Sequence, residues 1–269
     1  MFRSWCYRAT MDDLFADSDF AWSIRMRREE PGAFFARQDA TGSLLSRRNH
    51  WLDETPERCL STSPLMDAIT EDLWDLALSW YQVEKNGERT LENLSRQWEA
   101  DLILLDTETF RVAGGCVCFP SSWNLQEATG KTLSEVHAVV PGLSDELGPK
   151  IERFLRKLPP GQTFLRENWG MTRSGHLNYH PALERARLDE SVTLSEAFLR
   201  IEHQAFLRLP TAVLLGVRIE PVSLANLIVR HPETAARLRR QLETMPDEVA
   251  HYKSLEAGIP KITELLREA

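Results

Sequence analysis

Residues 197–219 read AFLRIEHQAFLRLPTAVLLGVRI, and this stretch decides the fold class. Two runs rich in apolar residues, 197–209 and 212–219, lie on either side of a short turn at Pro210 and Thr211. Runs of this length that are bounded by turn residues predict two antiparallel strands joined as a hairpin.

The first strand of this hairpin has one polar face. Because side chains alternate along a strand, one face carries Phe198, Arg200, Glu202, Gln204, Phe206 and Arg208, and the other carries Leu199, Ile201, His203, Ala205 and Leu207. Such a row of charges is typical of a solvated edge or of the polar rim of a pocket. Arg166, near Asn168 and Trp169, and Arg218 on the next strand are expected close to the same sheet face. Arginines in this position suit the carboxylate groups of a ligand.

Three further strands are predicted outside the hairpin. The apolar run 102–105 and the segment 111–119 form a second hairpin around a turn at 106–108, and residues 163–170 form another strand. Gly114 and Gly115 indicate a bulge or a close backbone approach. Helices are expected at 63–83, 90–98, 144–157, 223–230, 232–245 and 247–268.

This order of elements predicts an α+β fold. Clustered strands without strand–helix alternation favour an antiparallel sheet that is covered by helices. Five strands with a helix-containing crossover between the second and the third match the plan of a PAS-like sheet. We expect one domain over residues 1–269, with the sheet core at about 100–220, an N-terminal arm with helical pieces, and C-terminal helices packed on the sheet.

Composition narrows the class of protein. The formal net charge is −8 and no stretch is rich in Lys and Arg, so nucleic acid is not an expected partner. No run of 18 apolar residues and no apolar signal core near residue 1 are present, so a cytoplasmic protein without a membrane partner is expected. The four cysteines, Cys6, Cys59, Cys116 and Cys118, are then expected to be reduced. The Cys116–Cys118 pair favours small core residues over a redox or metal site.

The usual motifs for nucleotide, flavin and metal chemistry are missing. The chain has no GxGxxG after a strand, no GxxxxGK[ST], no GxSxG and no HExxH. It also lacks a four-cysteine spacing for an iron–sulfur cluster. If the chain carries out redox chemistry, its electrons are expected from another polypeptide.

Two histidine positions deserve comparison among the seven. His137 enters an apolar stretch beside Pro141 and Gly142, which suits an imidazole that points into a pocket, although a core or surface role fits the spacing as well. His176 and His180 are four residues apart and, with Glu184, form an alternative zinc site. The Gly175 and Pro181 that flank them indicate a loop instead.

Several ordered motifs in the second half of the chain resemble one family. They are FPSSWNL at 119–125, GKTLSEVH at 130–137, VPG at 140–142, IERFL at 151–155, NW at 168–169, LRIEHQ at 199–204 and RLP at 208–210. The chain resembles the haem-dependent oxidative N-demethylases over roughly residues 100–225.

This resemblance implies a PAS-like fold that binds haem b and uses dioxygen to remove a methyl group from a small secondary amine. Electrons would come from NAD(P)H through flavin and iron–sulfur partner proteins, which agrees with the missing motifs. It implies His137 as the iron ligand and Glu202 as the catalytic residue that binds the amine or relays protons. The residues that it implies around the haem are Arg166, Trp169, Arg200, Arg208 and Arg218.

The sequence departs from the family pattern where a substrate would bind. His203 stands where arginine is usual, which makes it a rival iron ligand, and residues 170–176 replace a loop that usually contains histidine and aspartate. The substrate therefore stays open. The alternative to an enzyme is a haem-binding or ligand-binding PAS-like sensor without turnover.

Overall fold

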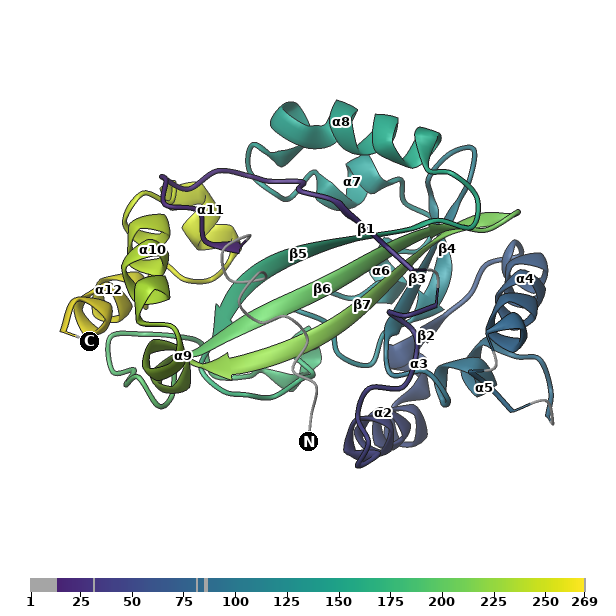
Figure 1. Ribbon diagram of the computed structural model, residues 1–269, viewed down its shortest axis with the longest axis horizontal. Coiled ribbons are helices and arrows are strands. Elements are labelled where there is room, and N and C mark those ends of the chain that lie inside the picture. Colours follow the sequence, from purple (N-terminus) through teal and green to yellow (C-terminus); the bar gives the residue numbers. More distant parts are fainter. Residues whose placement is uncertain (1–13, 31, 81, 85–86, 269) are drawn as a thin grey trace.

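The computed structural model describes residues 14–30, 32–80, 82–84 and 87–268. Its centre is one antiparallel sheet of seven strands, in the order β1-β5-β6-β7-β3-β4-β2 (Figure 1). The strands are β1 (Arg27–Glu29), β2 (Leu60–Ser61), β3 (Asp101–Asp106), β4 (Val112–Cys116), β5 (Thr163–Thr172), β6 (Phe198–Arg208) and β7 (Ala212–Ser223).

The expectation of five strands is wrong, because two short strands extend the sheet at its edges. β1 pairs with β5 and β2 pairs with β4. With three and two residues, they are too short to show the alternation by which a strand is recognised. The other five strands are those expected, and the crossover between β4 and β5 contains helices. The α+β class is confirmed, whereas the likeness to PAS proteins stays a prediction.

Both predicted hairpins are present. β6 and β7 pair from Phe198 with Ser223 to Arg208 with Val213, and β3 pairs with β4. The pairing of β3 with β4 shifts its register next to Gly114, as a bulge does. A Cβ atom on Gly115 would collide with the carbonyl oxygen of Leu102. The glycines are therefore needed for the close approach of β4 to its neighbours.

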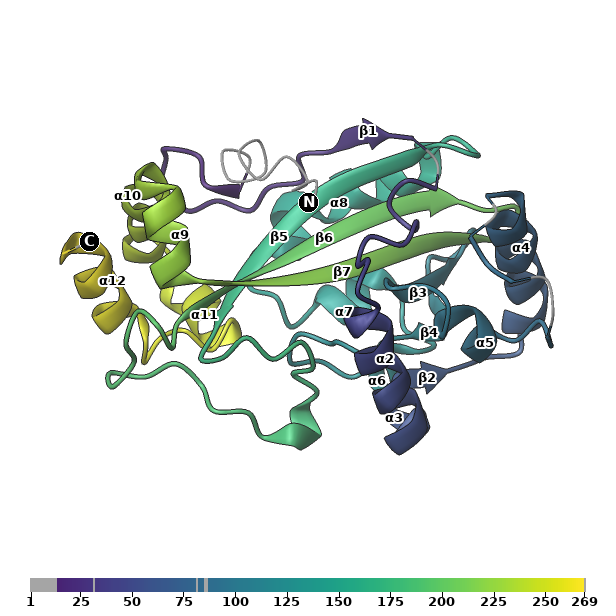
Figure 2. The ribbon, with the colours of Figure 1, turned by 60° about the horizontal axis from the view of Figure 1, so that its bottom comes forward.

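Helices cover the sheet from three sides. Those before β3 are α2 (Ser43–Glu54), α3 (Pro56–Cys59), α4 (Met66–Ser79) and α5 (Leu91–Ser95). Those in the crossover are α6 (Leu125–Ala128), α7 (Leu133–His137) and α8 (Leu143–Lys157). Those after β7 are α9 (Leu224–Arg230), α10 (Pro232–Glu243), α11 (Asp247–Tyr252) and α12 (Ile259–Glu268). Figure 2 shows α9–α12 at one end of the sheet and α2–α5 at the other.

The helix boundaries differ from the expected ones where local backbone chemistry intervenes. α4 begins at Met66 and not at 63, and α8 begins after Gly142, which is in the left-handed conformation that glycine favours. The predicted helix 247–268 is two helices, separated by a turn in which Ser254 has φ 55°. Among the described residues, no helix combines the length and hydropathy that crossing a membrane requires.

Three apolar clusters fix this arrangement. One joins α2, α4 and α5 to one face of the sheet, and a second joins α9–α12 to the ends of β5 and β6. The third packs Leu155 of α8 against Phe206 and Val213 on the other face. The helix predicted at 144–157 thus buries its apolar stripe as its periodicity indicated. Between the second and third clusters, β5 and β6 carry polar side chains.

Candidate functional site

The register of β5 and β6 brings four polar side chains together. Arg166 pairs with Gln204, and Asn168 pairs with Glu202. Since residues two apart point to the same face, all four lie on one face of the sheet. The prediction that Arg166 shares a face with Glu202 is confirmed.

Glu202 is held in place by three hydrogen-bond donors. The Ser121 hydroxyl donates to Oε1 at 2.5 Å, and the side-chain amides of Asn168 and Gln204 donate to Oε2 at 3.2 and 3.0 Å. A carboxylate accepts about four hydrogen bonds. Glu202 is half-buried. Its three hydrogen bonds fix its orientation and leave it able to accept one more.

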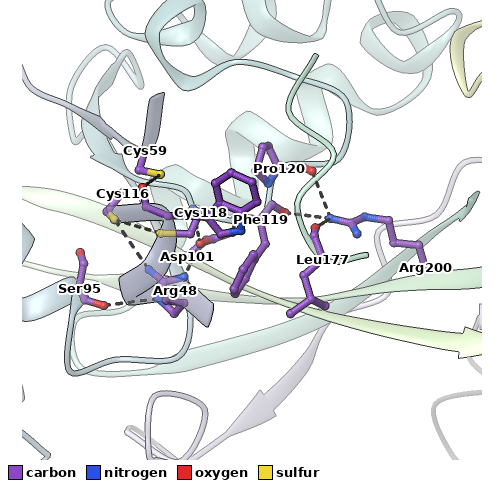
Figure 3. Close-up of polar contacts among 11 residues, drawn as sticks. Arg48, Cys59, Ser95, Asp101, Cys116, Cys118, Phe119, Pro120, Leu177 and Arg200 are labelled. Atoms are coloured by element: carbon purple, nitrogen blue, oxygen red, sulfur yellow. Dashed lines mark hydrogen bonds and ion pairs between the residues drawn. The ribbon is translucent and has the colours of Figure 1, made fainter. Parts of the chain in front are cut away.

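Arg200 is buried and supports this arrangement. Its Nε donates to the Ser121 hydroxyl at 2.8 Å. Its Nη2 donates to the carbonyl oxygens of Phe119, Pro120 and Leu177 (Figure 3). Nη1 donates to the carbonyl oxygen of His176 at 3.2 Å. Arg200 thus fixes two loops and Ser121 beside Glu202, and its donors are engaged by the protein.

A second buried arginine secures the strand that leads to Ser121. Arg48 contacts Asp101 at 2.5 Å, and that carboxylate accepts the backbone N–H groups of Cys118 and Phe119 (Figure 3). The Cys116 thiol lies beside this pair, and its hydrogen bond with Cys118 and its burial hold its pKa well above the usual range. Cys59, Cys116 and Cys118 are free buried thiols, as expected of core residues, and Cys6 lies outside the described residues.

Arg166 differs from both arginines because its charge is not neutralised by contact. Its guanidinium makes no hydrogen bond or ion pair with any described residue, and its buried Nε is without a partner. Burial lowers the pKa of Arg166, and the charges of Glu202 and Glu167 oppose that shift without contacting it. A buried donor without an acceptor costs free energy. An anion bound at this position would supply the missing acceptor.

His137 is the last residue of α7 and faces the same region. The helix begins with a capping box. The Thr132 hydroxyl accepts the backbone N–H of Glu135, and the Glu135 carboxylate accepts the backbone N–H of Thr132. Burial first, and then the charge of Arg166, lowers the pKa of His137. Among the described residues the imidazole has no hydrogen-bond partner, so a neutral ring nitrogen is available to a ligand.

Lys253 closes the site from the side of α11. Its ammonium group donates to the carbonyl oxygen of Trp169 at 2.8 Å and lies 5.5 and 5.3 Å from the ring centres of Trp22 and Trp169. Burial lowers the pKa of Lys253 to about 8; Arg166 adds to the shift and Glu202 opposes it. Lys253, Trp22, Trp169 and Arg166 line a cavity of about 190 Å³, whereas His137 and Glu202 are not part of its lining.

A comparison with protein families matches residues 63–261 to the family described as haem-dependent oxidative N-demethylase, alpha subunit-like. The match covers 199 of the 269 residues. This chain belongs to that family. The resemblance predicted from the motifs is confirmed, and haem-dependent oxidative chemistry is what the family's description indicates.

The residues of the site fit the haem that the family uses. A neutral imidazole suits iron, and an arginine without a partner suits a propionate. A Cβ atom on Gly170, which follows Asn168 on the same face, would meet no heavy atom of the described residues within 4 Å. Space is therefore open beside Gly170 on this face of β5.

Two of the arginines that were predicted around the haem lie elsewhere. The expectation that Arg218 shares the face of Glu202 is wrong, because Arg218 pairs with His203 and both lie on the opposite face. Arg218 donates to Glu99 at 2.5 Å and to the carbonyl oxygens of Phe34 and Ala36. Arg208 lies six residues from Glu202 on β6, which is roughly 20 Å.

Trp169 and His203 also point away from Glu202. Trp169 is one residue out of phase with Asn168, and its ring packs on Phe15 at 5.2 Å while it borders Lys253. The His203 ring contacts Glu220 at 3.0 Å and Glu167 at 3.7 Å. His203 was predicted to lie on the face opposite Glu202, and the pairing confirms this.

The alternative zinc site is not assembled. His180 Nδ1 accepts the backbone N–H of Ala182 at 3.2 Å and caps a short 3-10 turn, whereas His176 and Glu184 are exposed. The described part of the chain contains no group of three histidine, cysteine or carboxylate side chains that is placed to hold a metal ion.

Sequence reasoning missed three residues of the site. Ser121 lies in a quoted motif, but no local pattern shows that its hydroxyl meets Glu202, 81 residues later. Gln204 was recognised only as part of a polar face. Lys253 lies in a stretch without a recognisable motif, and only the packing of α11 brings it to Trp169.

Proposed function

We propose that this chain binds haem above β5 and β6 and oxidises a small amine, most simply by removing an N-methyl group. The observation that carries the proposal is the guanidinium of Arg166, which has no bonded partner among the described residues. Its charge helps to lower the pKa of His137, and it shares a sheet face with the fixed carboxylate of Glu202. Membership of the demethylase family supports it.

His137 would hold the iron and Arg166 would hold a propionate. The bound haem would supply the activation of dioxygen, with electrons from NAD(P)H that a separate flavin and iron–sulfur protein delivers. Arg200 and Arg218 are not included in the proposed haem site, since their donors bind protein oxygens, and Arg208 is omitted because of its distance.

Glu202 would bind the substrate as an ammonium ion. A small amine is protonated in neutral water, and a carboxylate fixed by three donors presents its negative charge without reorganisation. It would orient the N-methyl group and accept the proton that the amine must lose. Ser121 and Arg200 would keep the carboxylate in place.

The test is the visible spectrum of the full-length chain, expressed with sufficient haem, beside His137→Ala. We expect a Soret band in the parent that is weakened or shifted in the variant. His251→Ala, at an exposed histidine, is the matched control and should leave the band unchanged. A parent without a Soret band even after haem titration would refute the proposal, and identical bands in both proteins would move the iron ligand to another residue.

Turnover separates the enzyme from a sensor. With a reductase supplied, dioxygen consumption should depend on a secondary amine and yield formaldehyde, and Glu202→Gln should lower this rate more than it lowers haem content. Haem binding without amine-dependent dioxygen consumption, across a panel of small amines, would instead indicate a PAS-like sensor.

A further inference from the structure

A second hollow lies between α2 and the loop that follows β5. Its volume is about 430 Å³, which is within the range of ligand pockets. The residues that carry its chemistry are Arg47, His50, Trp51, His176, Asn178 and Arg185. They come from two segments more than 120 residues apart, so the fold and not a local run of basic sequence brings them together.

The polar groups of this hollow are cationic or neutral. None of the described residues that line it carries a carboxylate, although the chain as a whole has a net charge of −8. Within the described part of the chain, Arg47 makes no hydrogen bond or ion pair, and Arg185 uses only its Nε, on the carbonyl oxygen of Asn178 at 3.3 Å. Both guanidiniums therefore keep donors for a ligand.

The two arginines converge on one imidazole. Burial, followed by the charges of Arg185 and Arg47, lowers the pKa of His176. Arg47 and Arg185 also line the same hollow as this ring, so an anion bound there would face both guanidiniums. Like charges held together without a counter-charge repel, and an anion between them would remove that repulsion.

A buried amide and an indole complete the hollow. Asn178 is 6% exposed, and its Oδ1 accepts the backbone N–H of His180, while its amide nitrogen donates to no described residue. Trp51 of α2 is half-buried and also lines the hollow, with the centre of the His50 ring 5.3 Å from that of its own ring. The hollow thus combines charged donors, a buried neutral donor and a flat apolar surface.

We propose that this hollow binds a small phosphate ester that carries a planar ring, of the mononucleotide class. Arg47 and Arg185 would bind the phosphate, since paired guanidiniums match its oxygens. Asn178 would donate to a further oxygen, and the ring would stack on Trp51. This inference is independent of the proposed haem chemistry.

The test is calorimetric titration of the full-length protein with inorganic phosphate and with AMP at constant ionic strength. AMP should bind at least tenfold more tightly than phosphate. The double variant Arg47→Ala/Arg185→Ala should weaken both ligands at least tenfold, and Trp51→Phe should weaken AMP more than phosphate. The circular dichroism spectrum and the urea midpoint of each variant should match the parent's, which shows that the fold remains.

A matched control removes the same two charges elsewhere. Arg153→Ala/Arg230→Ala changes two exposed arginines outside the hollow and should keep the parent's affinity. No binding of either ligand at millimolar concentration, or equal affinity in parent and double variant, would overturn the proposal. If the parent binds neither ligand but the double variant loses reductase-driven turnover, the cluster docks an acidic protein partner and the nucleotide assignment fails.

Discussion

The two faces of β5 and β6 carry the same kinds of charged residue, but these residues form ion pairs on one face and not on the other. On one face, Glu167 contacts Arg27 at 2.5 Å and His203 contacts Glu220 at 3.0 Å. Next to them Arg218 is paired with Glu99 at 2.5 Å, with both side chains largely buried. Charge on this face is neutralised within the protein.

On the other face the pairing is incomplete. Among the described residues, Glu202 accepts hydrogen bonds from neutral groups only, and Arg166 has no bonded partner. Uncompensated buried charge costs free energy. A face whose buried charges are not neutralised is a candidate for a ligand site, whereas a face whose charges form ion pairs contributes to the stability of the fold.

The largest effect that this comparison predicts is on stability. Arg218→Ala leaves the Glu99 carboxylate buried without its cation, and breaking a buried pair costs about 3–5 kcal/mol. Urea unfolding followed by circular dichroism should show that loss in the free energy of unfolding. Arg89→Ala, which removes an exposed arginine paired with Glu71 and Asp75, should show no measurable loss. Equal losses in the two variants would mean that the buried ion pair of Arg218 and Glu99 does not stabilise the fold.

The second effect is on haem, and it should leave stability intact. Arg166→Met removes the charge and keeps the aliphatic stem, so the apoprotein should unfold at the same urea concentration or a higher one. The haem dissociation constant should rise about 10- to 100-fold, because a hydrogen bond to a charged group contributes about 1.5–3 kcal/mol. Haem titration followed at the Soret band measures it.

The control for this variant is on the same face. Arg208→Met removes an arginine at the far end of β6 and should keep the parent's haem affinity. If Arg208→Met weakened haem and Arg166→Met did not, the proposed site would lie at the wrong end of the strand.

The sequence predicted the central strands because burial leaves a local pattern. Alternation in 197–209 predicted β6 and both of its faces, and the paired glycines predicted the close approach at β4. β1 and β2 were missed because their pairing depends on partners far along the chain. The split of 247–268 into two helices depends on a turn that helical periodicity does not show.

The site was predictable only in part, for a related reason. Side-chain alternation gives the faces of one strand, but the register between strands depends on the turn, and that register sent Arg218 to the face opposite Glu202. Nor does a sequence reveal which arginine is already bound. The acceptors of Arg200 are backbone oxygens of loops that only the complete fold assembles.

The smallest effect is a change in the pH dependence of stability. It tests only the face that carries Glu167, His203 and Arg218. Burial disfavours the charged form of His203, but the carboxylates of Glu167 and Glu220, the second of which shares a hydrogen bond with the ring, outweigh it, so the pKa of His203 is raised. A raised pKa means that the folded state binds the proton more tightly than the unfolded chain does. This stabilisation is complete below the unfolded pKa of about 6.5 and disappears as the pH rises through the folded value. When the pH is raised from 6 to 9, the free energy of unfolding should therefore fall by about 1 kcal/mol less in His203→Gln than in the parent. This difference is the net contribution of one hydrogen bond. His251→Gln, at an exposed histidine, should follow the parent, and a His203→Gln protein with the parent's pH dependence would show that the charge of His203 is not held by this face.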